Sequence, residues 1–388
     1  MTRVKTLHVL FTGLVTPDMV SGGDQLFLDI APRLPKELKI VIVTPEFSKD
    51  LWKNIHRDNL EFRFLPTNRF DFKHSPVAIF LSYIIRSWQT YRLLQKEKIE
   101  VIYSCSDIAY ADIWPAYFLS TKKSIKWISR IYHVLLSPSR RQGGFLNNLG
   151  AFYLQRLSFW MMKRRSDTVL ALNQKLREEV IALGFPKEKV GILGAGIDFE
   201  MIHSFKKTQN YDYDVVVLGR IAPVKGIFDT IKVWEKVHSR NKKWKLGWIG
   251  GGNTNYVKKM SDLITDKDFG ESFSLLGFLE KDEVYNILKS AQVFLCPDHE
   301  NGWGLAVCEA MSSGLPVVSY DIDIFGGVYK KGFKSVPLFD TDRFADMLIE
   351  VLENESLRKK LGQEAVEQAK FFDHEKVVKD LVRIINRL

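Results

Sequence analysis

The segment from Pro297 to Val318 contains residues whose types and spacing suit the binding of a phosphate. A short apolar run, Val293–Cys296, predicts a buried strand, and a loop with Gly302 and Gly304 follows it before a helical stretch. A glycine loop that opens a helix exposes unpaired backbone N–H groups at the positive end of the helix dipole, where an anion is stabilised. The pattern therefore predicts an anion-binding turn between a strand and a helix.

A carboxylate lies just over one turn into the predicted helix, which covers residues 305–313. Glu309 is too deep to cap the helix, but it could reach the hydroxyls of a ribose whose phosphates lie at the helix start. Gly314 stands where a glycine commonly ends a helix, and Pro316 follows it before another apolar run. This order predicts a strand–helix–strand unit. The alternative is an ordinary turn of that kind with a buried Glu.

A basic pair follows another apolar run earlier in the chain. Arg220 comes directly after Gly219, and Lys225 directly precedes Gly226 and a helical pattern. A guanidinium and an ammonium held at a sheet edge can stabilise the negative charge that develops on a departing diphosphate, without a metal ion. The alternative for a single basic pair is charge exposed to solvent.

Together these positions resemble the signature of the retaining, GT-B-fold glycosyltransferases of family 4, also described as glycosyl transferases group 1. The matching residues, in the family's order, are Gly219-Arg220, Lys225-Gly226, Gly302-Trp303-Gly304-Leu305, Glu309 and Ala310-Met311. The first Glu of the family pattern falls on Asn301 here, and Glu300 stands one residue early. Its role toward the donor sugar therefore falls to Asn301 or, through a bulged loop, to Glu300.

The resemblance implies an α/β protein of the GT-B fold, with two Rossmann-like, doubly wound domains that face a deep cleft. It implies retaining transfer of a hexose from a nucleotide diphosphate sugar to a glycan or lipid-linked acceptor, with no metal and no cofactor. Arg220 and Lys225 would hold the diphosphate, and Glu309 the ribose. The other donor-binding residues that it implies are Gly22, Gly23, Gly219, Phe278, Gly302, Trp303, Gly304 and Leu305.

The amino-terminal half carries weaker motifs. Residues 7–11 predict a strand that leads to Gly22-Gly23 and a helical pattern, which suits an anion or a closely approaching ligand. Residues 125–131 predict a strand, and His133 follows its carboxyl end, where parallel sheets bind ligands. A plain turn and a structural histidine are the alternatives. The resemblance implies a glycine pair near the donor phosphates and a histidine close to the donor sugar.

Residues 137–165 interleave basic and bulky apolar side chains. The segment contains Arg140 and Arg141 near its start and ends in Lys163-Arg164-Arg165. Such a mixture is expected of a surface that lies on an anionic bilayer, and many relatives modify lipid-linked acceptors. The alternative is a core helix with a charged outer face.

Length and pattern predict the domain organisation. A chain of 388 residues suits two domains of ordinary size. Strands and helices alternate along it, which predicts parallel sheets. With the resemblance, we expect an acceptor-binding domain over residues 1–208, a nucleotide-sugar-binding domain over residues 209–373, and a C-terminal helix over residues 374–388 that crosses back to the first domain.

Composition limits the partners and the compartment. The net charge of +10 is compatible with nucleic acid, an acidic substrate or an anionic membrane, but no nucleic-acid-binding motif is present, so we expect no nucleic-acid partner. The three cysteines show no metal spacing and suit a reducing compartment. No apolar run is long enough to span a membrane. We expect a cytoplasmic protein, with peripheral attachment to the inner face of the plasma membrane as an option.

Two other functions remain open at this stage. The same fold hosts sugar-nucleotide epimerases, which need no acceptor, but these lack the Gly-Arg to Lys-Gly spacing and place acid/base carboxylates at the sugar. A non-catalytic subunit that binds a nucleotide sugar or a glycan is the second alternative, and Asn301 is the one departure that favours it.

Overall fold

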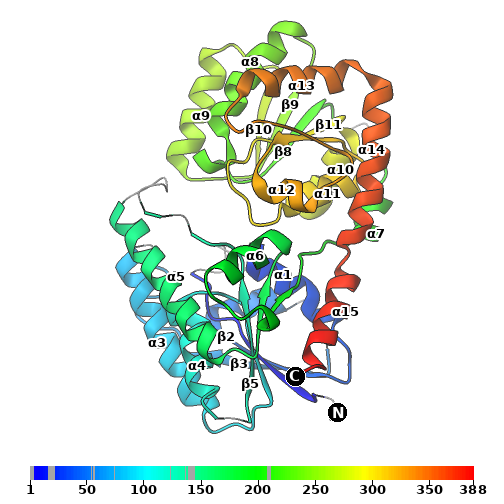
Figure 1. Ribbon diagram of the computed structural model, residues 1–388. Helices are drawn as coiled ribbons and strands as arrows, with labels where there is room; N and C mark the ends of the chain where they lie inside the picture. Colours follow the sequence, from blue (N-terminus) through cyan, green and yellow to red (C-terminus); the bar gives the residue numbers. More distant parts are fainter. Residues whose placement is uncertain are drawn as a thin grey trace. The chain divides into compact units, whose positions relative to one another are not determined.

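The computed structural model describes residues 4–15, 22–53, 55, 57–73, 75–122, 124–135, 137–138, 145–207 and 211–388. The chain divides into two units, each built around its own parallel sheet (Figure 1). The first unit comprises Met1–Ala195 and His374–Leu388, and the second comprises Gly196–Asp373. Each unit is an α/β structure with helices flanking the sheet, as the alternation of strand and helix patterns predicts.

The first unit contains a seven-stranded sheet in the order β3-β2-β1-β4-β5-β6-β7, with every neighbouring pair parallel. The strands are β1 (Thr6–Leu10), β2 (Lys39–Pro45), β3 (Leu60–Leu65), β4 (Val101–Ser104), β5 (Lys126–Ile131), β6 (Thr168–Ala171) and β7 (Val190–Ile192). The α-helices are α1 (Gly22–Ile30), α2 (Lys49–Trp52), α3 (Pro76–Leu94), α4 (Trp114–Leu119), α5 (Phe145–Arg165), α6 (Gln174–Ala182) and α15 (His374–Ile385).

The second unit contains a six-stranded parallel sheet in the order β10-β9-β8-β11-β12-β13. The strands are β8 (Val215–Leu218), β9 (Leu246–Ile249), β10 (Phe273–Gly277), β11 (Val293–Cys296), β12 (Val317–Tyr320) and β13 (Phe333–Val336). The α-helices are α7 (Phe199–Ser204), α8 (Ile227–Arg240), α9 (Thr254–Asp266), α10 (Lys281–Ser290), α11 (Leu305–Ser312), α12 (Asp323–Val328), α13 (Thr341–Glu353) and α14 (Glu355–Ala369).

Each sheet forms the centre of its own core. The central residues of β2 and β8 are buried almost completely, because helices cover both faces of each sheet. The side chains that α15 adds to the core of the first unit are Val377, Val378, Leu381 and Ile385. The three cysteines are buried and unpaired. None of the described helices is both long and apolar enough to cross a bilayer.

The division between the units lies after Ala195, whereas we expected it after residue 208. Two contacts account for the difference. Ile197 donates a backbone hydrogen bond to Phe372 at 2.8 Å, and α7 packs against α11. Both contacts are made with residues of the second unit. The polar composition around residue 208 therefore does not mark the boundary, since Ile197 and α7 already pack with the second unit.

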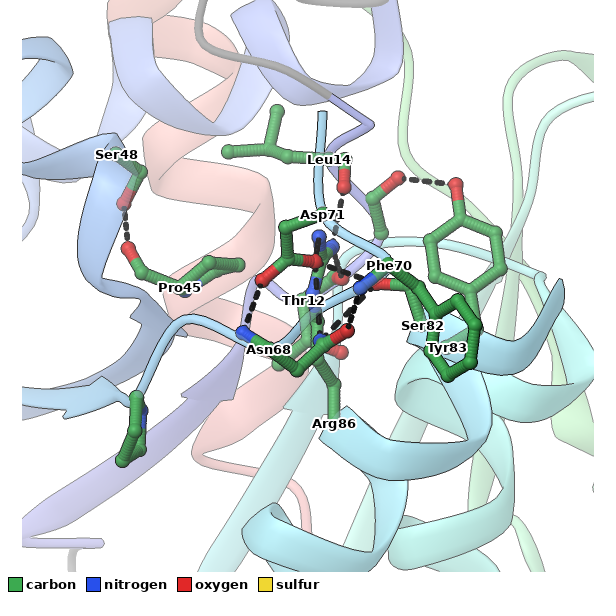
Figure 2. A network of polar contacts seen from close by, with 12 residues as sticks. Thr12, Leu14, Pro45, Ser48, Asn68, Phe70, Asp71, Ser82, Tyr83 and Arg86 are labelled. Atoms are coloured by element: carbon green, nitrogen blue, oxygen red, sulfur yellow. Dashed lines mark hydrogen bonds and ion pairs between the residues drawn. The ribbon is translucent and has the colours of Figure 1, made fainter. Parts of the chain in front are cut away.

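A buried network around the Arg86–Asp71 ion pair joins α3 to the loop that follows β1 (Figure 2). The Arg86 guanidinium on α3 donates to the Asp71 carboxylate and to the carbonyl oxygens of Thr12 and Leu14. The side chains of both ionised residues are only 1% exposed. Asp71 also accepts from the Ser82 hydroxyl at 2.5 Å, so its charge has several donors. The network fixes residues 12–14 at the carboxyl end of the central strand.

Removal of Asp71 should destabilise the first unit by about 3 kcal/mol, because the buried Arg86 would lose the carboxylate that compensates its charge. The measurement is hydrogen exchange of the α3 and β1 amides in Asp71→Ala, with Asp58→Ala, at an exposed position, as the control. Equal protection in the two variants would contradict the assigned role of the pair.

Candidate functional site

The second sheet has a topological switch point between β8 and β11. The strand that follows β8 in the chain, β9, lies on one side of β8, and the strand that follows β11, β12, lies on the opposite side of β11. The two loops that leave these strands therefore diverge, and ligands of such sheets bind in the crevice that opens there. The loops are residues 219–226 and 297–304, which are the two segments that the sequence motifs single out.

The loop after β8 presents two cations in different states. Arg220 is exposed, and its guanidinium makes no hydrogen bond or ion pair to another described residue. Lys225 is the last residue of a short 3-10 helix, Pro223–Lys225, and its side chain is only 20% exposed. One cation is thus unengaged at the sheet edge, and the other is fixed in place.

Backbone contacts hold these loops together. Gly226 has a φ of +66°, and a Cβ added there would lie 2.1 Å from the carbonyl oxygen of Pro297. Gly250, after β9, has a φ of +131°, and its added Cβ would lie 2.2 Å from the carbonyl oxygen of Gly219. Because only glycine allows such approaches, the loops after β8, β9 and β11 pack directly on one another.

Asp298 connects the two motifs. Its Oδ2 accepts a hydrogen bond from Lys225 Nζ at 2.5 Å and another from Asn301 Nδ2 at 2.6 Å. The Asn301 Oδ1 in turn accepts from the backbone N–H of Trp303 at 3.1 Å. Asn301 is therefore engaged at both ends, while Glu300 is exposed. Of these two candidates for the sugar position, the structure places Asn301 in the network with Lys225 and leaves Glu300 outside it.

His299, the residue that follows Asp298 in the loop, is also anchored. His299 Nε2 lies 2.8 Å from Asp229 Oδ2, to which the Tyr320 hydroxyl also donates at 3.0 Å. The backbone N–H of His299 donates to the carbonyl of Val224 at 2.9 Å. These contacts attach the loop of Asp298 to the loop of Lys225, through Val224, and to the first turn of α8, through Asp229.

The start of α11 is set by Gly304, which has a φ of +88°. The Tyr329 hydroxyl lies within hydrogen-bonding distance of the carbonyl oxygens of Trp303 and Gly304, at 2.8 and 3.0 Å, and so fixes the turn that Gly302 enters. Leu305 is the first helical residue. Because α11 begins after the loop that leaves β11 at the switch point, the backbone N–H groups of its first turn lie at that end of the sheet, as expected for an anion site.

Gly314 ends α11 as predicted. It has a φ of +88°, its N–H donates to the carbonyl of Met311, and the N–H of Leu315 donates to the carbonyl of Ala310. This pair of bonds is a Schellman motif. Glu309 lies on the same helix, half-buried, and accepts from the Tyr285 hydroxyl at 3.4 Å. Glu309 thus has a structural partner beside its predicted role at the ribose.

Phe278 extends the same edge of the sheet beyond β9. It follows Gly277, which has a φ of +70°, and 85% of the Phe278 side chain is exposed. The strand order places the end of β10 next to the end of β9, on the β8 side of the switch point. The exposed ring is available to a flat group such as a nucleobase.

The first unit has its own switch point, between β1 and β4. Asp112 is fully buried there. Its Oδ1 accepts from the Thr12 N–H at 2.9 Å and from the Thr12 hydroxyl at 2.7 Å, and its Oδ2 accepts from the Ser106 N–H at 2.8 Å. The carboxylate therefore joins the loop after β1 to the loop after β4. Burial nevertheless raises the pKa of Asp112 to about 6.

Asp112 should make the first unit less stable as the pH rises. Its pKa is higher in the folded state than its ordinary value of 3.8, so the folded state binds the proton more tightly than the unfolded state does. The resulting stabilisation is complete below pH 4 and is lost as the pH rises through about 6. Between pH 4 and pH 7 the wild type should lose about 2 to 3 kcal/mol relative to Asp112→Asn. Parallel urea titrations at several pH values would measure this, and parallel curves would contradict it.

His133 lies at the end of β5, as predicted, and is exposed. Burial raises the pKa of Asp107, while His133 nearby acts in the opposite direction. Gln155 of α5 donates to the carbonyl of His133 at 2.8 Å and to Asp107 Oδ2 at 3.4 Å. The structure thus brings His133 together with a carboxylate at the edge of the first sheet.

Gly23 has a packing reason to be glycine. A Cβ added there would lie 2.7 Å from the Tyr132 ring, and the Tyr132 hydroxyl donates to the carbonyl of Cys105 at 2.6 Å. Gly22 is the first residue of α1. The predicted approach of this glycine pair to the donor phosphates remains a prediction.

Three carboxylates at these sites escaped the sequence analysis: Asp107, Asp112 and Asp298. Asp107 and Asp298 each follow within three residues of the carboxyl end of a strand, β4 or β11, where ligand-binding side chains gather. That position was the available signal for both. Asp112 lies in a π-helical turn, Ala109–Ile113, that no local pattern indicates.

The two doubly wound units define a protein of the GT-B fold class. The Anabaena protein HepE, solved with UDP and glucose, matches the whole chain over its own whole length with a TM-score of 0.76 at 15% identity. Residues 198–368, which lie in the second unit, match the family described as "Glycosyl transferases group 1". These matches confirm the predicted fold and support the predicted family.

Curated relatives are similar over part of the chain. The alpha-galactosylglucosyldiacylglycerol synthase of Streptococcus pneumoniae is 21% identical over 64% of this chain and 68% of its own length. The amylovoran biosynthesis glycosyltransferase AmsK of Erwinia amylovora is 25% identical over 40% of this chain, which spans only 39% of AmsK. Both matches support a glycosyltransferase.

Proposed function

We propose that the protein is a retaining, metal-independent glycosyltransferase that moves a hexose from a nucleotide diphosphate sugar to a glycan or a lipid-linked acceptor. The observation that carries the proposal is the pair of cations at the switch point of the second unit. Arg220 is unengaged and Lys225 is fixed, and the first turn of α11 offers backbone N–H groups beside them. A diphosphate needs such an arrangement of positive charge and amide donors.

The roles of the remaining residues follow from their places around this cation pair. In this proposal Glu309, on α11, would accept hydrogen bonds from ribose hydroxyls, and the exposed Phe278 ring would offer a face to the base. As the sugar leaves, Arg220 and Lys225 stabilise the charge on the diphosphate. In a front-face reaction the leaving phosphate oxygen accepts the proton of the acceptor hydroxyl as the new glycosidic bond forms on the same face.

The acceptor is assigned to the first unit. Asp107 and His133 lie at the carboxyl edge of its sheet, where ligands of parallel sheets bind, and His133 keeps the role near the donor sugar that the resemblance implies. The choice between glycan and lipid-linked acceptors rests on the relatives: one is named for a diacylglycerol product and another for amylovoran biosynthesis.

The donor class can be tested by thermal melting of the full chain with UDP, GDP, ADP or CMP, each with and without EDTA. A nucleotide at about 100 times its dissociation constant should stabilise the protein by about 2.7 kcal/mol. We expect one diphosphate to raise the melting temperature, with EDTA causing no change. No shift with any of these nucleotides would overturn the proposal. The anomeric configuration of the product, read by NMR, would test retention.

A further inference from the structure

Helix α3 buries several polar side chains and exposes its large apolar ones, the reverse of the usual arrangement. Its buried side chains include the polar residues Ser82, Arg86, Ser87 and Thr90, whereas its large exposed side chains are Val77, Phe80, Ile84 and Trp88. The exposed set recurs at spacings of three and four residues, so it forms one stripe along the helix. The buried polar face is explained by the Arg86–Asp71 network and by Ser87, which donates to the carbonyl of Tyr110 at 2.6 Å. On the apolar side, the Phe80 ring packs edge to face on Tyr110, and the four side chains of the stripe stay exposed.

The stripe continues across two neighbouring helices. Figure 1 shows α3, α4 and α5 as a layer of adjacent helices in the first unit, and α4 contacts both of the others. Ring contacts connect Tyr91 of α3 to Trp114 and Phe118 of α4, and Tyr117 of α4 to Trp160 of α5. Phe118, Tyr153 and Trp160 are exposed. The α3–α4–α5 surface, which consists of the stripe on α3 together with Phe118, Tyr153 and Trp160, therefore exposes large apolar side chains from three adjacent helices.

The charges of this surface are of one sign. None of the three helices contains Asp or Glu, although the chain has 46 such residues. Arg92 lies 3.8 Å from the centre of the Trp88 ring, and Arg164 lies 4.6 Å from that of Trp160. Cations held beside exposed indoles match the polar boundary of an anionic bilayer, where the rings enter the headgroup region and the guanidinium groups meet phosphates.

We propose that the α3–α4–α5 surface docks the protein on an anionic membrane. The inference extends the expected contact of residues 137–165 to α3, which supplies the largest exposed apolar stripe. Within that range, α5 contributes Tyr153, Trp160 and Arg164, while Phe159 and Met162 of the same helix belong to the core. Residues 139–144 lie outside the described residues. The proposal does not depend on the transfer reaction.

Vesicle flotation tests it with the full chain. We expect binding to phosphatidylcholine vesicles that contain phosphatidylglycerol, weaker binding to pure phosphatidylcholine, and a loss of affinity of about tenfold or more in Ile84→Glu/Trp88→Glu. Tyr256→Glu, at an exposed aromatic position on α9, is the matched control and should bind as the wild type does. A thermal melt of each variant checks folding. Absence of binding to anionic vesicles, or equal binding by all variants, would overturn the proposal, as would a dimer that the double variant dissociates.

A second, independent inference concerns Asp298. The loop from Pro297 to Gly304 carries two carboxylates, and Glu300 is exposed away from the network. Asp298 is 10% exposed at the side chain and shares one oxygen between Lys225 and Asn301. Its other oxygen, Oδ1, accepts no hydrogen bond from a described residue. A carboxylate beside a diphosphate-binding cation repels the phosphates, but it suits the hydroxyls of a sugar attached to them.

We infer that Asp298 faces the donor sugar. It would take the role toward that sugar that the family motif gives to the residue at position 301. Asn301 and Lys225 hold its Oδ2, which leaves Oδ1 for a sugar hydroxyl. The inference rests on the proposed function, since it needs a sugar nucleotide in this site. It predicts opposite effects of Asp298→Asn on two ligands. The free diphosphate should bind about as tightly or more tightly, because a repelling charge is removed, whereas the nucleotide sugar should bind about tenfold more weakly.

Calorimetric titration of UDP and UDP-glucose, and of GDP and GDP-mannose, measures both ligands in each variant. Asn301→Asp places two carboxylates together and should weaken both ligands, and the swapped variant Asp298→Asn/Asn301→Asp should recover part of the binding of the nucleotide sugar. If the wild type binds no diphosphate, the proposed function fails. If the wild type binds but Asp298→Asn weakens diphosphate and nucleotide sugar equally, Asp298 only supports the loop and this inference fails.

Discussion

Lys225→Ala should lower kcat/KM by about 10²- to 10³-fold, which is the usual effect of removing one donor that stabilises charge on a leaving group. The structure gives two reasons for an effect at the upper end of this range. The ammonium is 20% exposed and held at 2.5 Å by Asp298, so it is oriented before the ligand binds. Its removal also leaves the Asp298 charge uncompensated at the site where phosphates would bind.

The matched control is Lys242→Ala. Lys242 is exposed in the segment that precedes β9, at the amino edge of the same sheet. The control removes the same charge from the same unit, so it corrects for the change in net charge. We expect it to alter kcat/KM by less than about twofold, given the screening of exposed charges by salt. A Lys225→Ala enzyme within tenfold of the wild type would show that the diphosphate is held elsewhere.

The sequence predicts the elements of this site better than the contacts between them. Gly314 and Pro316 identify the end of α11 because helix termination is a local event, and the structure shows the expected Schellman motif. The strand patterns of β8 and β11 also locate both site loops, since each loop follows a short apolar run that predicts a buried strand.

The contact between Lys225 and Asp298 could not be predicted in this way. It joins residues 73 positions apart, and it depends on β8 and β11 being neighbours across the switch point, which no local pattern specifies. The same reason applies to Asp112, which bonds to Thr12 100 positions away. The inverse arrangement of α3 was missed for another reason. A helical period shows that apolar residues share a face, but it does not show which face lies against the sheet.

A large loss of stability in the second unit is expected for Gly226→Ala. The residue combines a φ of +66° with a Cβ position 2.1 Å from the carbonyl oxygen of Pro297. The left-handed conformation alone costs an L-residue about 1 to 2 kcal/mol. The clash is with backbone, so it can be relieved only by separating the loops after β8 and β11. We expect a total destabilisation of about 4 kcal/mol, with loss of nucleotide binding at temperatures where the variant remains folded.

Gly219→Ala provides a control within the same loop. No atom lies within 4 Å of the Cβ position at Gly219, and its φ is outside the left-handed region. Its free energy of unfolding should therefore match that of the wild type to within about 0.5 kcal/mol. Thermal unfolding followed by tryptophan fluorescence compares the two variants. If both lose stability equally, the loop tolerates no side chain anywhere, and the contact with Pro297 is not the cause. If only Gly226→Ala does, the approach of these two backbones is what holds Lys225 beside Asp298.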